Sequence, residues 1–202
     1  MLTLEELHKQ ILKCQKCPLS QTRTNIVPGE GNTKAEIMFI GEGPGKNEDE
    51  QGKPFVGAAG KVLDKMLASI NLDRKDVFIS NIVKCRPPGN RDPLPEEVNA
   101  CWDWLAQQIE IIKPKMIILL GRHSMDRFLP NQRISQIHGQ PKRRGGQVYF
   151  PVYHPAAALY RGNLLADLQK DFLKIPKVLE KIKEGNAGEE NRESLKQAKL
   201  EL

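Results

Sequence analysis

Ile37-Met38-Phe39-Ile40-Gly41-Glu42-Gly43-Pro44-Gly45 is the stretch that decides the fold. Its first four residues form a short apolar run followed at once by glycine, which predicts a buried strand ending in a tight loop. Glycines let the backbone approach a ligand closely, and Glu42 adds a carboxylate at the carboxyl end of the strand, where open α/β sheets bind their ligands. The stretch therefore predicts a sheet and a site, although glycines alone fit an ordinary strand-to-helix turn equally well.

Further strands and helices alternate along the chain. Apolar runs predict strands at 77–83, 116–120 and 148–153, and helical spacing covers Leu63 to Ile70 and Val98 to Ile112. Alternation of this kind predicts a parallel sheet with helices on both faces. Because Pro151 cannot donate to a strand ladder, we expect the last strand to lie at an edge or to be bulged there.

The composition is that of a single domain with a full core. The chain has 202 residues and a hydrophobic fraction of 39%. Its first residues lack the basic start and apolar centre of a signal peptide, and no apolar run is long enough to span a membrane. We therefore expect a cytoplasmic protein with no membrane partner. Residues 183–202, which are rich in charge, are expected to form a flexible tail.

The positive charge is concentrated in the body of the chain. Net charge is +6, and residues 183–202 hold more acidic than basic side chains, so the excess lies before them. Between Arg122 and Arg144 six basic residues face the single acid Asp126, and Lys142-Arg143-Arg144-Gly145-Gly146 predicts a hairpin tip. Such a body favours a polyanionic partner, although a solvated surface has the same pattern.

Four cysteines form a candidate metal site. Cys14 and Cys17 close a helix whose start at Thr3 and Glu6 has the form of a capping box. A redox pair of the thioredoxin type opens a helix instead. With Cys85 and Cys101 the pair could bind zinc or an iron–sulfur cluster, and the absence of a second Cys-x-x-Cys in the sequence slightly favours the cluster. Four unrelated buried cysteines are the alternative.

Polar side chains are predicted to meet at one rim of the sheet. Asn81 lies inside an apolar strand, where its amide needs partners. His154 precedes Pro155, which suits the first turn of a helix and leaves the imidazole at the carboxyl edge of the sheet, beside Glu42 and Asn81. Each residue alone fits a structural role, but their convergence favours a functional one.

These motifs together resemble the family 4 uracil-DNA glycosylases, the iron–sulfur type. The resemblance includes Gly41 to Gly57, Asn81, the cysteine spacing and His154-Pro155-Ala156-Ala157, and it extends in order from about Leu4 to Ile182. It implies a three-layer α/β/α domain over residues 1–182, with a central four-stranded parallel sheet. It also implies a monomeric base excision repair enzyme, which flips uracil out of single- or double-stranded DNA and hydrolyses its N-glycosidic bond.

The resemblance further implies a ligand set and residue roles. A structural [4Fe–4S] cluster would be held by Cys14, Cys17, Cys85 and Cys101. Phe55 would stack on the uracil, Asn81 would pair with its imide edge, and backbone amides around Glu42 and Gly43 would bind a carbonyl. Glu48 would exclude thymine, and His154 would stabilise the departing base. Glu42 is the nearest candidate for activating water and Asn90 a weaker one, because Gly43 stands where the related family 1 enzymes carry an aspartate.

The DNA-binding residues are expected on the basic surface and beyond His154. Phosphate contacts are predicted for Arg86, Arg91, Lys142, Arg143 and Arg144, and Leu159 and Arg161 are candidates to fill the gap left by the flipped base. An iron–sulfur protein that binds single-stranded DNA without releasing a base is the alternative. A phosphate-group hydrolase is disfavoured, because no set of metal-binding carboxylates accompanies the glycine loop.

Overall fold

Six strands form one sheet in the order β1-β3-β2-β4-β6-β5. In this computed structural model, which describes residues 2–185, the four inner strands are parallel and the two outer strands are antiparallel to their neighbours. The strands are β1 (Glu30–Gly31), β2 (Ile37–Gly41), β3 (Phe78–Asn81), β4 (Met116–Leu120), β5 (Lys142–Arg144) and β6 (Gln147–Val152). The predicted four-stranded parallel sheet is confirmed, and a short strand extends it on each side.

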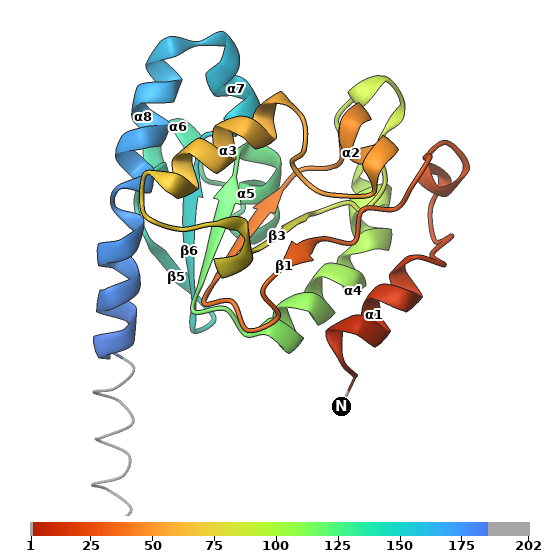
Figure 1. The fold of residues 1–202 in the computed structure, drawn as a ribbon, viewed down its shortest axis with the longest axis horizontal. Coiled ribbons are helices and arrows are strands. Elements are labelled where there is room, and N and C mark those ends of the chain that lie inside the picture. Colours follow the sequence, from red (N-terminus) through yellow and green to blue (C-terminus); the bar gives the residue numbers. More distant parts are fainter. Residues whose placement is uncertain (1, 186–202) are drawn as a thin grey trace, which may run out of the picture.

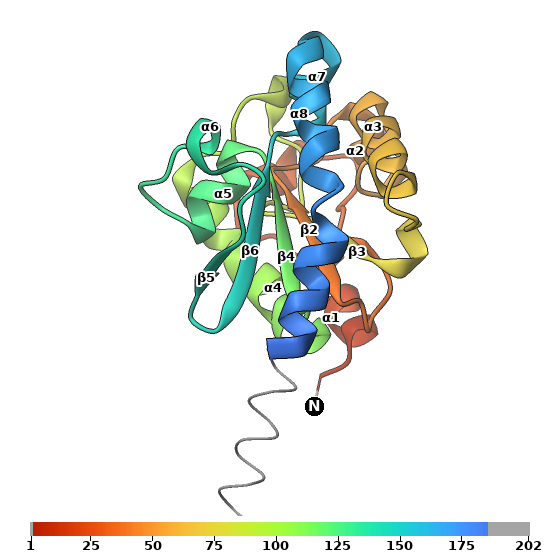
Figure 2. The ribbon, with the colours of Figure 1, turned by 90° about the vertical axis from the view of Figure 1, so that its left-hand side faces the viewer.

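Both faces of the inner strands are buried, which explains their continuous apolar runs. Because side chains alternate along a strand, Met38 and Ile40 pack into one core while Ile37 and Phe39 pack into the other. All residues of β2 and β4 are buried in this way. The sheet is therefore the middle of three layers (Figures 1 and 2).

Helices cover the two faces as the alternating pattern predicts. The first core takes side chains from α1 (Leu4–Ile11), α4 (Pro95–Ile112), α5 (Arg122–Phe128) and α6 (Ile134–Ile137). The second takes them from α3 (Ala58–Ala68), α7 (Pro155–Tyr160) and α8 (Gly162–Phe172). The short α2 (Lys46–Gln51) follows the glycine loop, and single helical turns occur at Pro18–Gln21, Arg74–Asp76 and Pro88–Asn90.

Local signals in the sequence account for several boundaries. The capping box is present, since the Thr3 hydroxyl accepts from the Glu6 amide and the Glu6 carboxylate accepts from the Thr3 amide. The predicted hairpin is formed by β5 and β6, with Gly145 and Gly146 in its turn at φ of 54° and 82°.

The expectation for Pro151 is wrong in one respect. Its strand, β6, lies between β4 and β5 and is not the edge strand. However, β5 pairs only with residues 147–149 of β6, so the ladder on that side has ended before Pro151. No hydrogen bond with β5 is therefore lost at the proline.

The carboxyl ends of the four parallel strands meet at one rim, which lies toward the top of Figure 1. Helical residues continue over 175–185 after a turn at 173–174. The predicted tail lies outside the described residues except for 183–185, which are helical. None of the described helices is both long and apolar enough to cross a bilayer.

Candidate active site

A cavity of about 290 Å³ lies at the carboxyl end of the sheet. Every residue predicted to contact the base or the water lines it: Glu42, Gly43, Glu48, Phe55, Asn81, Asn90 and His154. These residues come from loops after β2, β3 and β6, which a parallel sheet brings to the same edge. The cavity is large enough to hold one small planar ring.

Asn81 ends β3 with its side chain 1% exposed. Its Oδ1 is the one buried side-chain polar atom in residues 2–185 that has no hydrogen-bond partner. Any side chain at position 41 would collide with this oxygen and with the Phe55 ring, which explains the glycine there. Asn81 also lines the cavity, and because a buried acceptor left unpaired is costly, the side-chain amide is expected to find its partner in a ligand there.

Phe55 is held in a left-handed conformation with φ of 54°. Its ring is buried, and its centroid lies 5.7 Å from that of His154. Arg74 clamps the loop by donating to the carbonyl oxygens of Pro54, at 2.9 Å, and Phe55. Gly60 leaves room for the Phe55 carbonyl, which any side chain there would strike. A strained residue fixed from several sides is typical of a preformed binding surface.

Glu48 joins the two loops that form one side of the cavity. Its carboxylate accepts from the backbone amides of Gly45 at 3.1 Å, Val56 at 2.9 Å and Gly57 at 2.8 Å. Three backbone donors hold the group in one position, so Glu48 is a rigid part of the wall.

His154 caps the amino terminus of α7. Its Nδ1 accepts from the Ala156 amide at 3.1 Å, so in the neutral ring the proton is on Nε2. Burial is the main cause that lowers the pKa of His154 to about 4; the electrostatic effect of His123 acts in the same direction, and that of Glu48 opposes it. His154 is therefore a neutral hydrogen-bond donor at neutral pH.

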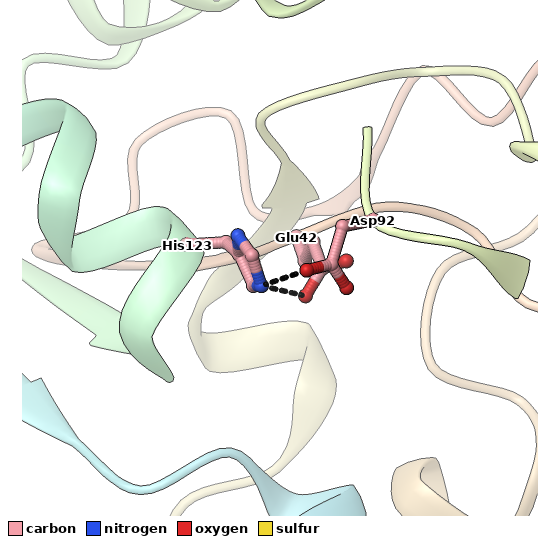
Figure 3. A group of neighbouring side chains, drawn as sticks. All are labelled: Glu42, Asp92 and His123. Atoms are coloured by element: carbon pink, nitrogen blue, oxygen red, sulfur yellow. Dashed lines mark ion pairs between the residues drawn. The ribbon is translucent and has the colours of Figure 1, made fainter. Parts of the chain in front are cut away.

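Glu42 belongs to a cluster that the sequence did not predict. Figure 3 shows the Nε2 of His123, from α5, facing the carboxylates of both Glu42 and Asp92. It lies 3.1 Å from Asp92 Oδ2 and 3.7 Å from Glu42 Oε2. Burial raises the pKa of the Glu42 carboxyl, His123 lowers it, Asp92 raises it and Arg122 lowers it. The charge on Glu42 thus depends on its neighbours as well as on its burial.

The loop after Cys85 carries two predicted arginines, of which only Arg91 lines the cavity, and each has an intramolecular partner. Arg86 Nε donates to Asn90 Oδ1 at 2.7 Å, which orients the Asn90 amide on the wall. Arg91 lines the cavity and forms a two-point ion pair with the buried Glu97, at 2.6 and 2.9 Å. Both arginines therefore shape the loop.

The other predicted DNA contacts divide into two places. Leu159 is 44% exposed in α7, directly beyond His154, and Arg161 ends that helix. By contrast, Lys142 lies opposite Tyr149 and Arg144 opposite Gln147, so the hairpin turn is at the amino end of β6. Figure 2 shows this turn low in the view and α7 at the top. The structure does not bring Lys142, Arg143 and Arg144 to the cavity.

The four cysteines gather at a second small cavity. All four thiols are free, Cys14 Sγ accepts from Trp104 Nε1 at 3.2 Å, and Cys85 Sγ accepts from Arg23 at 3.1 Å. Among the described residues, one group of three side chains of metal-ligating types has its ligand atoms all within 4.8 Å of one another, and it consists of Glu42, Asp92 and His123 rather than of cysteines.

A buried lysine lines the same cavity. Lys84 is 1% exposed, and its Nζ donates to Ser80 Oγ at 2.6 Å, Asn81 O at 2.9 Å and Gln108 Oε1 at 2.8 Å. All three acceptors are uncharged, yet a buried ammonium needs a compensating negative charge. Thiolates at Cys85 and Cys101, bound to a cluster, would supply it. The donor set therefore fits an anionic iron–sulfur group.

Sequence reasoning missed His123, Asp92, Arg74 and Lys84. His123 had a usable signal, because Gly121-Arg122-His123 follows a predicted strand and so lies on the rim already assigned to Glu42. Asp92 and Arg74 act through contacts between loops, which leave no periodic pattern. Lys84 had none either, since a lone lysine in a sequence normally indicates a surface position.

Comparisons with known proteins agree with this geometry. Residues 28–180 match the family described as the uracil DNA glycosylase superfamily. Type-4 uracil-DNA glycosylases from Archaeoglobus fulgidus and Sulfurisphaera tokodaii are each 50% identical over 87% of this chain, covering 92% and 84% of their own length. That of Thermotoga maritima is 43% identical over 84% of this chain and 95% of its own. With a sheet, a cavity and a rim of the kind that its motifs predicted, the chain belongs to the uracil-DNA glycosylase superfamily and, within it, to the type-4 enzymes.

Proposed function

We propose that this cavity receives a uracil flipped out of DNA and that the protein hydrolyses its N-glycosidic bond, leaving an abasic site for repair. The observation that carries the proposal is the unpaired Oδ1 of Asn81. Uracil presents an imide N–H beside a carbonyl, so the Asn81 oxygen accepts from the imide while its NH₂ donates to the carbonyl. Cytosine presents the opposite pattern and leaves both groups unpaired.

Phe55 provides the stacking surface. Extracting a base from the duplex costs a few kcal/mol, and a preformed aromatic face offsets part of that cost. The clamp by Arg74 and the position of Gly60 keep the ring in place before the base arrives. The immobile carboxylate of Glu48 borders the same space, which supports its role in excluding a base with an extra methyl group.

Breaking the glycosidic bond leaves negative charge on the base. As the bond between the sugar carbon and the uracil nitrogen breaks, its electron pair moves into the ring and onto a carbonyl oxygen. The Nε2–H of His154 is positioned on the cavity wall to donate to that oxygen, and a fixed donor of this kind lowers the barrier most where charge develops.

Glu42 activates the water. Its carboxylate lies on the cavity wall and accepts a proton as the water oxygen bonds to the sugar carbon. Asn90, held by Arg86, lies on the same wall and orients the water. Leu159 and Arg161 lie where they reach the DNA beyond the flipped base.

A [4Fe–4S] cluster bound by Cys14, Cys17, Cys85 and Cys101 supplies cross-linking rather than chemistry in this proposal. It ties the segment after α1 to the loop after β3 and to α4. Two fixed cations, Lys84 and Arg23, lie beside these sulfurs and fit an anionic group.

The test is base release. Purified protein is incubated with single- and double-stranded oligonucleotides that contain uracil, hypoxanthine or a thymine mismatch, and alkali-labile sites are counted. We expect sites at uracil and no release of thymine. Tight binding without any alkali-labile site would replace the enzyme with a single-stranded DNA-binding protein.

A further inference from the structure

His123 and Asp92 lie outside the lining of the cavity, yet His123 contacts the carboxylate of Glu42. The Nε2 of His123 is within ion-pair distance of both Glu42 and Asp92 (Figure 3). Two carboxylates this close repel each other unless a positive charge lies between them.

We infer that His123 is a positioning residue for the water-activating carboxylate of Glu42, and that Asp92, which contacts the same imidazole, opposes the effect of His123 on the charge of Glu42. The inference rests on the proposed function and assigns this pair a part in the same reaction. Contact of the His123 imidazole with both carboxylates fixes the direction of the Glu42 side chain, and its electrostatic effect lowers the pKa of Glu42 and so favours the charged form. A charged Glu42 is the form that accepts a proton from water.

Other charged groups lie near Glu42, and their effect on its carboxylate must be distinguished from that of His123. Arg122 lies on the same helix as His123 and contacts both His123 and Asp92, with its Nη2 3.6 Å from Asp92 Oδ2 and 3.1 Å from His123 Nε2. That side chain is 62% exposed, so solvent screens its charge more strongly than that of the 26% exposed His123. The remaining charged or titratable groups on the cavity are Glu48, Arg91 and His154.

Two variants are expected to move the pH profile in opposite directions. His123→Gln removes the imidazole whose electrostatic effect lowers the pKa of Glu42, so the acidic limb of the single-turnover rate moves to higher pH. Asp92→Asn removes the charge that raises that pKa, so the limb moves to lower pH. Below the midpoint of the acidic limb, the rate of His123→Gln should be about threefold to tenfold lower than the parental rate. Above that midpoint the loss of rate should be much smaller.

Lys115→Gln is the matched control. This lysine pairs with Glu36 at 2.8 Å before β4, at the opposite end of the sheet, and should leave the profile unchanged. DNA affinity and thermal unfolding are measured for each variant, because a purely structural role would change those quantities and not the midpoint. Because Asp92 is 66% exposed, its variant should fold even if His123→Gln does not.

The outcomes separate the two proposals. If the parental protein releases no uracil, the proposed function fails. If it releases uracil and both variants keep the parental midpoint, or both shift it the same way, the assignment of His123 and Asp92 is overturned while the enzyme remains. Opposite shifts with unchanged DNA affinity support the assignment.

Discussion

Lys84 donates a hydrogen bond from its Nζ to the main-chain carbonyl oxygen of Asn81, over 2.9 Å and out of contact with solvent. Asn81, which we propose recognises the base, is thus held by the residue that precedes Cys85. Gln108, from α4, accepts from the same ammonium, so the contact joins the end of β3 to the helix that carries Cys101. The cysteine cavity and the uracil pocket therefore share part of their framework.

Lys84→Met should weaken this framework. The substitution leaves the oxygens of Ser80, Asn81 and Gln108 without their donor and removes a positive charge beside the thiolates, at a cost of about 1 to 3 kcal/mol for each buried group. We expect a lower unfolding temperature and a cluster that is harder to reduce, measured by calorimetry and redox titration. Lys16→Met is the control, because Lys16 stacks 4.4 Å from the centre of the Trp104 ring but is 46% exposed. Equal potentials in the two variants would contradict the charge argument.

The cluster itself is tested through Cys85. Protein purified without oxygen should be brown and contain about four iron atoms per chain. Cys85→Ala should lose the colour and loosen the fold, since one ligand of the cross-link is gone. Iron and zinc analysis, together with the visible absorption spectrum, distinguishes a cluster from a zinc ion. A colourless parental protein that contains one zinc ion would rule the cluster out.

Asn81→Ala should abolish most uracil excision with little loss of DNA binding. A site built around a hydrogen bond can discriminate by roughly 10⁴, because the unpaired groups of the wrong base remain buried. Asn81→Asp, whose oxygens accept from an amino group, should keep weak activity and relax toward cytosine. Single-turnover cleavage of matched uracil and cytosine duplexes measures both effects. Asn99→Ala, which changes an exposed amide in α4, is the control. An Asn81→Ala protein that cleaves uracil at the parental rate would place recognition elsewhere.

The salt dependence of DNA binding should separate the two basic regions. DNA whose base enters the cavity must pass over its rim, so Arg161 is expected to contact a phosphate. Arg161→Gln should then reduce the slope of log affinity against log salt by about one. Lys142→Gln, on the hairpin at the other end of the sheet, should reduce it less. Equal reductions would show that DNA also follows the hairpin.

The stability of the folded protein should fall as His154 is forced to bind a proton. Its pKa is about 4 in the folded chain against the ordinary 6.5. Between these values the unfolded chain carries a proton that the folded chain lacks, so the free energy of unfolding decreases as pH falls, by about 1.4 kcal/mol per unit. His154→Gln should flatten that slope in denaturant titrations. Identical slopes for the two proteins would mean that His154 is protonated in the folded state.

The sequence predicted the layers and most of the cavity, because both follow from local patterns. Buried runs such as Ile37–Ile40 identify strands, and parallel strands bring Glu42, Asn81 and His154 to one edge. The two-residue strand β1 has no pattern long enough to detect. His123 and Lys84 were missed because their importance comes from packing between distant segments. Lys142 to Arg144 were correctly placed on a hairpin, but sequence could not tell toward which end of the sheet its turn lies.

The segment from Asn81 to Arg91 passes from the uracil cavity to the cysteine cavity and returns, since Asn81 lies in the first, Cys85 in the second, and Asn90 and Arg91 in the first again. A glycosylase that loses its selectivity is a mutagen, because cytosine is joined to DNA by the same kind of bond. Here oxidative damage at Cys85 would disturb the groups that hold the base and the water together. Such damage should silence the enzyme before it can attack intact DNA.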